Sequence, residues 1–216
     1  MTGSTDHLLA VSSVPERRYY EAYSRDYGPR ERRRARYFCY DTEAGFVAGA
    51  NVSVVFTFDA PVGLVWDVIQ DFNNWANSAD YYYLLGNLGR MEGQGFRIGA
   101  SPADTGPNQY VVTKVIPEFM LVISQPVPEG NDLGRGFEIG HGGVSAGAHV
   151  VTLDEFAGTT VVNFFMEHAS IMAGPGEATR DEDVLDPWRE MTESADWKWR
   201  DHFIPAMRAS VAERSS

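Results

Sequence analysis

Titratable side chains in the second half of the chain are the candidates for chemistry. Four of the five histidines, His141, His149, His168 and His202, lie there together with Glu167. An imidazole that is removed from water beside a carboxylate can accept and return a proton near neutral pH, which is the basis of general acid–base catalysis. These five residues are the predicted catalytic set, provided that the fold carries them into an apolar cavity.

The closest grouping among them depends on a predicted hairpin over residues 144–169. Neighbouring residues of a strand point to opposite faces, so only one of Glu167 and the histidine after it can share a face with His149. If Leu153 lies opposite Val161, His149 and Glu167 share a face and can make a diagonal contact. A shift of one residue removes that contact, and a solvated or structural role is the alternative for each side chain.

The other two histidines lie on a predicted helix and in a predicted loop. His202 falls on the apolar stripe of a helix expected over residues 186–212, where a hydrogen-bonded core histidine is the alternative. His141 lies in the glycine-rich segment 138–143, which can close over a ligand or serve only as a flexible connection.

Residue types that bind metals occur without a metal-binding spacing. The chain has no His-x-His and no His-Glu-x-x-His sequence, and its glycine-containing segment 93–99 lies between predicted strands, with no helix after it to receive a phosphate. We therefore expect no metal ion and no other cofactor. The residue types concerned are Glu138, His141, His149, Glu167 and His168.

Composition limits the partners and the compartment. The 216 residues are enough for one ordinary domain, and the net charge of −12 argues against nucleic acid. No apolar run approaches the roughly 20 residues that span a bilayer, so we expect no membrane insertion. No signal peptide is evident, and the single cysteine, Cys39, cannot form an intrachain disulfide. The cytoplasm is the expected compartment.

A basic segment departs from this acidic average. Residues 15–40 hold eight arginines against four acids and six of the ten tyrosines. Such an arm can bind RNA or an anionic surface, or it can pack on its own acidic body or on a second subunit of a homodimer. We favour packing, and predict that residues 1–50 form an N-terminal extension with helix between Pro15 and Tyr40, broken near Gly28-Pro29.

The main domain is predicted over residues 51–216. Alternating apolar residues at 52–58 indicate a strand, after which Asp59 is the expected N-cap of a helix with Leu64 and Val68 at helical spacing. A second short helix is expected to begin within residues 71–75. Short strands follow at 81–88, 95–100, 110–116 and 119–125, then the hairpin. The final helix has Asp186 as its expected N-cap, and Pro205 predicts a kink because it removes a donor to the Asp201 carbonyl.

This order of elements resembles that of the START/SRPBCC superfamily, which includes polyketide cyclases/dehydrases and lipid-transfer domains. The resemblance is carried most clearly by one run of residues, Ala60-Pro61-Val62-Gly63-Leu64-Val65-Trp66-Asp67-Val68-Ile69-Gln70-Asp71-Phe72-Asn73-Asn74-Trp75. The resemblance covers residues 51–212. It implies an α+β helix-grip fold, in which a curved antiparallel sheet wraps around a long C-terminal helix and leaves a cavity between them. It carries over no catalytic residue, and fold alone does not settle function.

Aromatic side chains on the elements that would line such a cavity are the predicted ligand-binding residues. They favour flat, partly polar molecules, and about half of those on strands are expected to face inward. They are Tyr81, Tyr83, Phe96, Tyr110, Phe137, Phe165 and Trp199.

The function expected from these observations is binding of a small hydrophobic, aromatic or polyketide-like molecule, followed by lyase, cyclase or dehydratase chemistry. A non-catalytic carrier of a lipid or aromatic metabolite is the alternative. A third hypothesis is an interaction module that uses the basic arm. An enzyme needs a histidine paired with a carboxylate or tyrosine inside the cavity, whereas a carrier needs almost none.

Overall fold

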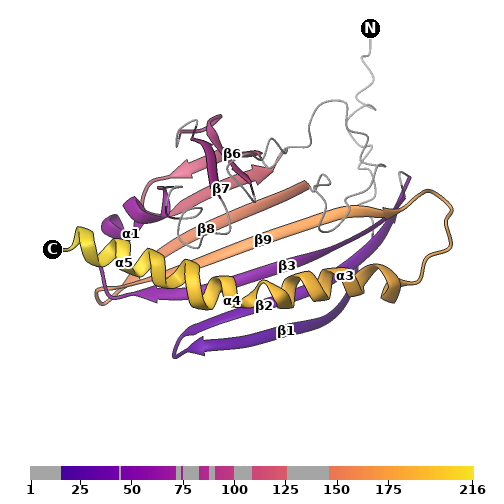
Figure 1. Ribbon diagram of the computed structural model, residues 1–216, viewed down its shortest axis with the longest axis horizontal. Helices are drawn as coiled ribbons and strands as arrows, with labels where there is room; N and C mark the ends of the chain where they lie inside the picture. The colour runs from indigo at the N-terminus through magenta and orange to yellow at the C-terminus, as the bar shows by residue number, and fades with distance from the viewer. Residues whose placement is uncertain are drawn as a thin grey trace, which may run out of the picture.

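A computed structural model describes residues 16–43, 45–71, 74, 83–87, 91–99, 109–125 and 146–216. One sheet of nine antiparallel strands, in the order β1-β2-β3-β9-β8-β7-β6-β5-β4, dominates this part of the chain. The sheet curves around a long helical rod at the C-terminal end of the chain (Figure 1). The predicted α+β helix-grip fold is confirmed.

The basic arm forms a hairpin instead of the predicted helix, so that prediction is wrong. Strand β1 covers Arg18–Gly28 and β2 covers Glu31–Thr42, joined by a tight turn in which Arg30 has a φ of 69°. The next strand, β3, covers Gly45–Phe58. The boundary expected after residue 50 therefore falls inside β3, and residues 18–42 extend the same sheet.

The centre of the sheet is built from three long strands. Strand β3 pairs with β9, Thr159–Ala173, which pairs in turn with β8, Ala146–Phe156. A two-residue turn joins β8 to β9, and both of its residues have positive φ, 52° at Ala157 and 78° at Gly158. This turn sets Phe156 opposite Thr159, and so Leu153 lies opposite Val162, one residue away from the register considered above.

The other side of the sheet consists of β7 (Met120–Gln125), β6 (Gln109–Ile116), β5 (Gly95–Gly99) and β4 (Tyr83–Asn87). Helix α1, Val62–Ile69, follows β3 as expected, and it buries Val65, Trp66, Val68 and Ile69. The second short helix expected after it falls mostly outside the described residues. Pro61, and not Asp59, occupies the N-cap position of α1. The Asp59 carboxylate instead accepts a hydrogen bond from the Thr159 hydroxyl at 3.3 Å.

The helical rod starts earlier than predicted and changes its winding in the middle. Helix α3 covers Asp181–Ser194, so Pro187 lies inside it and Asp186 is not the N-cap. Helix α4 (Asp196–Lys198), a π-helical turn (Trp199–Phe203) and α5 (Ile204–Arg214) follow. The π-helical turn ends at Phe203, two residues before Pro205. The winding is irregular where proline removes a donor, and the rod continues into α5 without the predicted break.

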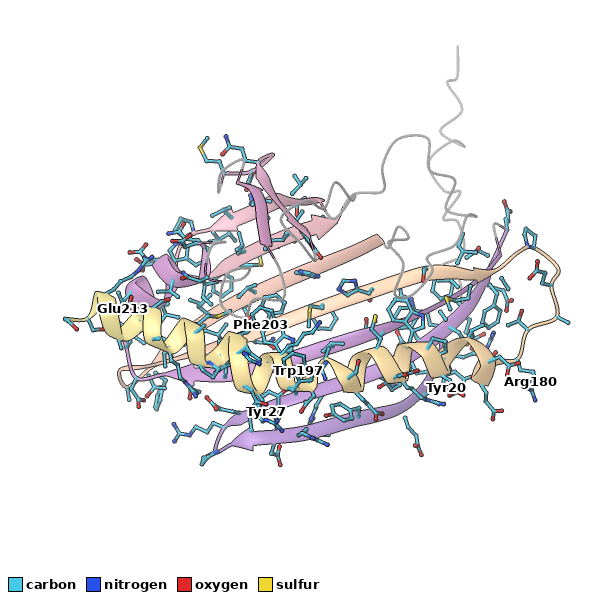
Figure 2. The ribbon with its side chains drawn as sticks, viewed as in Figure 1. Tyr20, Tyr27, Arg180, Trp197, Phe203 and Glu213 are labelled. Atoms are coloured by element: carbon cyan, nitrogen blue, oxygen red, sulfur yellow. The ribbon has the colours of Figure 1, made fainter. Side chains whose placement is uncertain are left out.

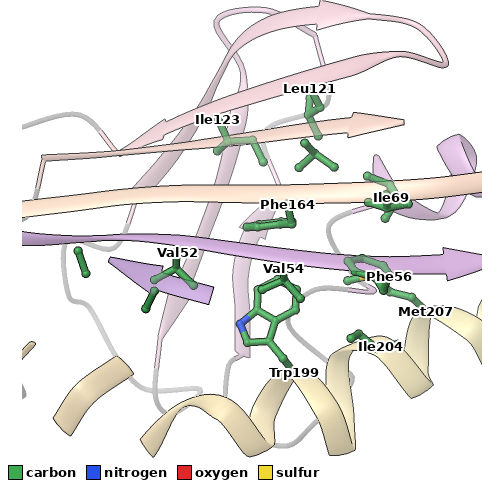
Figure 3. Close-up of a cluster of buried hydrophobic side chains, with 14 of the residues drawn as sticks. Val52, Val54, Phe56, Ile69, Leu121, Ile123, Phe164, Trp199, Ile204 and Met207 are labelled. Atoms are coloured by element: carbon green, nitrogen blue, oxygen red, sulfur yellow. The ribbon is translucent and has the colours of Figure 1, made fainter. Parts of the chain in front are cut away.

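The core lies between the inner face of the sheet and this rod (Figure 3). Trp199 packs against Phe56 and Phe164, with ring centroids 6.4 Å and 4.8 Å away, and Ile204 and Met207 extend the contact along α5. Burying these large apolar side chains supplies most of the driving force for folding. No helix in the described residues is long and apolar enough to cross a membrane.

Charged and polar bonds join the β1–β2 hairpin to the rod. Arg33, only 2% exposed, donates to the Thr192 carbonyl at 2.7 Å and lies 3.7 Å from the Asp196 carboxylate, which also accepts from Tyr27 at 2.8 Å. At the other end of β1, Tyr20 and Arg18 bind Asp181. Tyr20 and Tyr27 thus reach the rod from both ends of β1 (Figure 2). The arm packs on its own acidic body.

Candidate functional site

Two histidines meet on the inner face of β8 and β9. The Nε2 atoms of His149 and His168 lie 3.0 Å apart, within hydrogen-bond distance. Their ring centroids are separated by 5.0 Å and the planes are inclined by 53°. Of the predicted catalytic residues, these two are brought into direct contact.

The strand register explains why this pair forms. His149 lies opposite Met166, and His168 lies opposite Gly147, so the two histidines are diagonal neighbours on one face. Gly147 leaves room for the second ring, because a Cβ there would lie 3.2 Å from Nδ1 of His168 and 3.1 Å from the Glu167 carbonyl oxygen. Because Gly147 has no side chain, the His168 imidazole can occupy this position.

Desolvation keeps both imidazoles neutral. His149 is 8% exposed, and desolvation, reinforced by the neighbouring His168, holds its pKa well below the ordinary 6.5. Desolvation also lowers the pKa of His168, to about 4, although the nearby Glu167 charge opposes this shift. Near neutral pH the pair carries no charge.

Two neutral imidazoles at this distance share one hydrogen. One Nε2 must carry the proton and the other must accept it, which fixes opposite tautomers on the two rings. Nδ1 of His149 is buried and has no hydrogen-bond partner among the described residues. That atom is a lone pair in one tautomeric arrangement and an N–H donor in the other, so the pair can transfer a proton between its two ends.

Aromatic rings surround His149. The ring of Tyr110, from β6, lies 5.4 Å from it, and Phe164, from β9, lies 5.7 Å away. Phe164 in turn contacts Trp199 on the π-helical turn. The predicted ligand residues Tyr110 and Trp199 are thus connected to the histidine pair directly or through Phe164. A polar pair within an aromatic wall suits a flat, mainly apolar molecule.

Glu167 and Phe165 lie on the other face of the sheet, so the diagonal contact between His149 and Glu167 does not form. The one-residue difference in register carries them to the outer face. Glu167 there binds the Arg17 guanidinium through two hydrogen bonds, both of 3.0 Å. This bidentate pair gives Glu167 a structural partner outside the histidine site.

The remaining predicted residues are placed as follows. His202 belongs to the π-helical turn and contacts Trp197 edge to face, with centroids 5.0 Å apart. Tyr83 lies in β4, and Phe96 lies in β5 opposite Asn87. His141, Tyr81 and Phe137 fall outside the described residues. Within the part of the chain that the structure covers, no three His, Cys, Asp or Glu residues gather as metal ligands would.

The sequence-based prediction missed the role of Gly147 and left Phe164 out of the ligand-binding residues, although Phe164 lies on a strand expected to line the cavity. A signal for both was present, because the Ala157-Gly158 turn alone sets the register that places Gly147 opposite His168 and Phe164 on the face of His149. The buried Arg33 was also missed, since nothing local indicates that one of three successive arginines faces a core.

Comparison with known proteins supports the fold and does not define a family. No protein-family model matches the chain, and no curated protein matches its sequence. Among solved structures, SA2116 from Staphylococcus aureus, a protein of unknown function, superposes with a TM-score of 0.52 at 11% identity, over 77% of this chain and 97% of that one.

Two further solved structures have lower scores. NE0264 from Nitrosomonas europaea gives a TM-score of 0.49 at 13% identity, over 76% of this chain and 95% of that one. CalU16 from Micromonospora echinospora gives 0.40 at 20% identity, over 84% of this chain and 92% of that one.

Proposed function

We propose that this chain is a START/SRPBCC-type protein of the cytoplasm that binds a small, largely apolar, aromatic or polyketide-like molecule between its sheet and its C-terminal rod. It transforms that molecule by acid–base chemistry of the lyase, cyclase or dehydratase type, without a cofactor. The observation that carries this proposal is the His149–His168 pair, with its Nε2 atoms 3.0 Å apart beside aromatic rings and with His149 buried.

The role proposed for the pair is a proton relay. His149 takes a proton from an activated carbon or hydroxyl of the bound molecule, and the shared hydrogen passes through Nε2 to His168 or back. In a dehydration, one nitrogen accepts the C–H proton, and a proton returned by the pair leaves with the hydroxyl group as water. The pair ends in its starting protonation state, so no other reactant is needed.

The low pKa values restrict the substrate. A base such as His149, whose pKa is held well below 6.5 by desolvation, removes only protons that a neighbouring group already acidifies, such as a C–H next to a conjugated carbonyl. A neutral pair in a desolvated place also favours a neutral ligand over a charged one. Both conditions fit an aromatic or polyketide-like ketone.

A carrier without chemistry is the second candidate, and the aromatic wall favours it. Phe164 and Trp199 offer apolar contact that needs no proton transfer. In this case the histidine pair would only hydrogen-bond to a polar group of the cargo, and its unpartnered Nδ1 would be the contacting atom.

Native mass spectrometry of freshly purified protein tests the proposal. Any co-purified small molecule is identified after denaturation, and its structure is followed during incubation with the wild type, His149→Ala, His168→Ala and the outer-face control Glu167→Gln. The enzyme proposal expects conversion in the wild type and the control, and its loss in both histidine variants. A stoichiometric ligand that stays intact identifies a carrier, and conversion that survives both histidine changes refutes the relay.

A further inference from the structure

Three arginines of β2 form a column on the outer face of the sheet. Arg32, Arg34 and Arg36 are exposed, and none of them makes an ion pair with any residue that the structure describes. Alternate residues of a strand lie about 6.6–6.8 Å apart, so this arginine column extends over about 13 Å. Arg36 is held over the Tyr19 ring at 4.2 Å, which fixes one end of the column.

An acidic stripe of similar length follows the solvent-facing side of α3. Its members are spaced four, four and three residues apart, which places them on one face of a helix, and all are exposed; they are Glu182, Asp186, Glu190 and Glu193. The first three extend over about 12 Å at 1.5 Å per residue. Asp186 already pairs with Arg189 at 2.8 Å, so Glu182 and Glu190 are the main charges of this stripe. The opposite face of α3 holds the buried residues Val184, Leu185, Trp188 and Thr192.

The arginine column and the acidic stripe cannot meet within one molecule. Arg33, between two members of the column, points inward and binds the Thr192 carbonyl of α3, so the rod lies on the inner face of β2. The column points the other way because strand residues alternate between faces. The sheet itself therefore separates two surfaces of matching length and opposite charge.

We infer that the arginine column of one copy of this chain binds the acidic stripe of a second copy. Each copy then offers a column to one neighbour and a stripe to another, so the contact is heterologous and forms a ring or an open chain of subunits. Exposed ion pairs contribute little individually, so this association is weak and depends on salt. The inference is independent of the proposed acid–base chemistry.

Sedimentation equilibrium of the full chain over a wide concentration range tests it. The wild type is expected to self-associate, and raising NaCl from about 0.1 M to about 0.5 M is expected to reverse this, since the Debye length falls from about 10 Å to about 4 Å. Arg34→Glu/Arg36→Glu and, separately, Glu182→Arg/Glu190→Arg should each weaken self-association by at least about tenfold. A wild type that stays monomeric overturns the inference.

Mixing the two variants gives the decisive result. The first presents two acidic surfaces and the second two basic ones, so neither pairs with itself, yet the two together restore both contacts. Net charge cannot explain such a rescue, because the variants carry about −16 and −8 against −12 in the wild type and still repel at long range. Failure of the mixture to associate overturns the inference.

A matched control separates local pairing from net charge. Lys114→Glu/Arg200→Glu makes the same charge change at exposed cations away from the column. This control should keep its self-association constant within about twofold of the wild-type value. An effect as large as that of Arg34→Glu/Arg36→Glu refutes the assignment of the contact to the arginine column. Far-UV circular dichroism verifies folding, and Arg34→Gln/Arg36→Gln replaces the reversal if that variant misfolds.

Discussion

Removing the Asp196 carboxylate should loosen the β1–β2 hairpin from the rod. In the variant Asp196→Ala the Arg33 guanidinium, 2% exposed, keeps its bond to the Thr192 carbonyl but loses its counter-charge 3.7 Å away. Tyr27 loses its carboxylate acceptor as well and keeps only the residue 196 backbone carbonyl, at 3.5 Å. Leaving one partner of a buried pair without the other typically costs about 3–5 kcal/mol. For a chain of this length that lowers Tm by roughly 10 °C.

The assay is urea unfolding followed by circular dichroism, together with hydrogen exchange of β1 and β2. The double variant Arg33→Met/Asp196→Leu is the matched control, because it removes both charges and should recover most of the lost stability. Arg25, 53% exposed, returns to water in either variant. The predicted tie between hairpin and rod is refuted if the free energy of unfolding of Asp196→Ala lies within about 1 kcal/mol of the wild-type value, or if amide hydrogen exchange in the hairpin is unchanged.

Three further predictions concern the site and its surroundings. Gly147→Ala should displace the His168 ring, and so lower turnover or ligand affinity while changing Tm little. Unchanged turnover and ligand affinity in this variant would contradict the positioning role of Gly147. Lowering the pH from about 6.5 to about 4 should destabilise the fold, because unfolded His149 and His168 each gain a proton that the desolvated rings refuse, and His168 alone should contribute about 3 kcal/mol; His168→Gln should make this dependence shallower in urea titrations at each pH. The double variant Tyr37→Phe/Thr192→Val should be neutral or stabilising in thermal melts, since the two buried hydroxyls lie beside each other and have no other partner among the described residues, and a loss above about 1 kcal/mol would mean that they are satisfied.

Much of the fold could be predicted from periodicity, because the central strands bury one face and the rod buries one stripe. The hairpin could not, for a physical reason visible in β1. Tyr20, Tyr23 and Tyr27 all pack toward the core, with a spacing of three and four residues that imitates a helix. A bulge between Tyr20 and Ala22 shifts the strand by one residue, so residues an odd number apart share a face. In β2 the inward Arg33 masks the alternation further.

The geometry of the histidine site depends on the register between β8 and β9. His149 and His168 were both candidates, but their contact follows only from pairing Phe156 with Thr159 across the two-residue turn. The same turn sends Glu167 outward to Arg17, whose position in sequence, 150 residues away, no local pattern reveals. The titratable residues could thus be identified from the sequence by their type, whereas their contacts depend on residues that are far away in the sequence.

The ties between the hairpin and the rod also affect the order in which the chain folds. Arg33 and its acceptor Thr192 are 159 residues apart, and Glu31 and its partner Arg208 are 177 residues apart. During synthesis the hairpin is made first, but a buried arginine cannot be neutralised until the helical rod exists. Strand β3 also lacks its neighbour β9 until residues 159–173 have been made, so that edge of the β1–β2–β3 segment keeps unpaired backbone groups through most of translation. Contacts of such long range slow folding, so locking of this edge should be among the last steps.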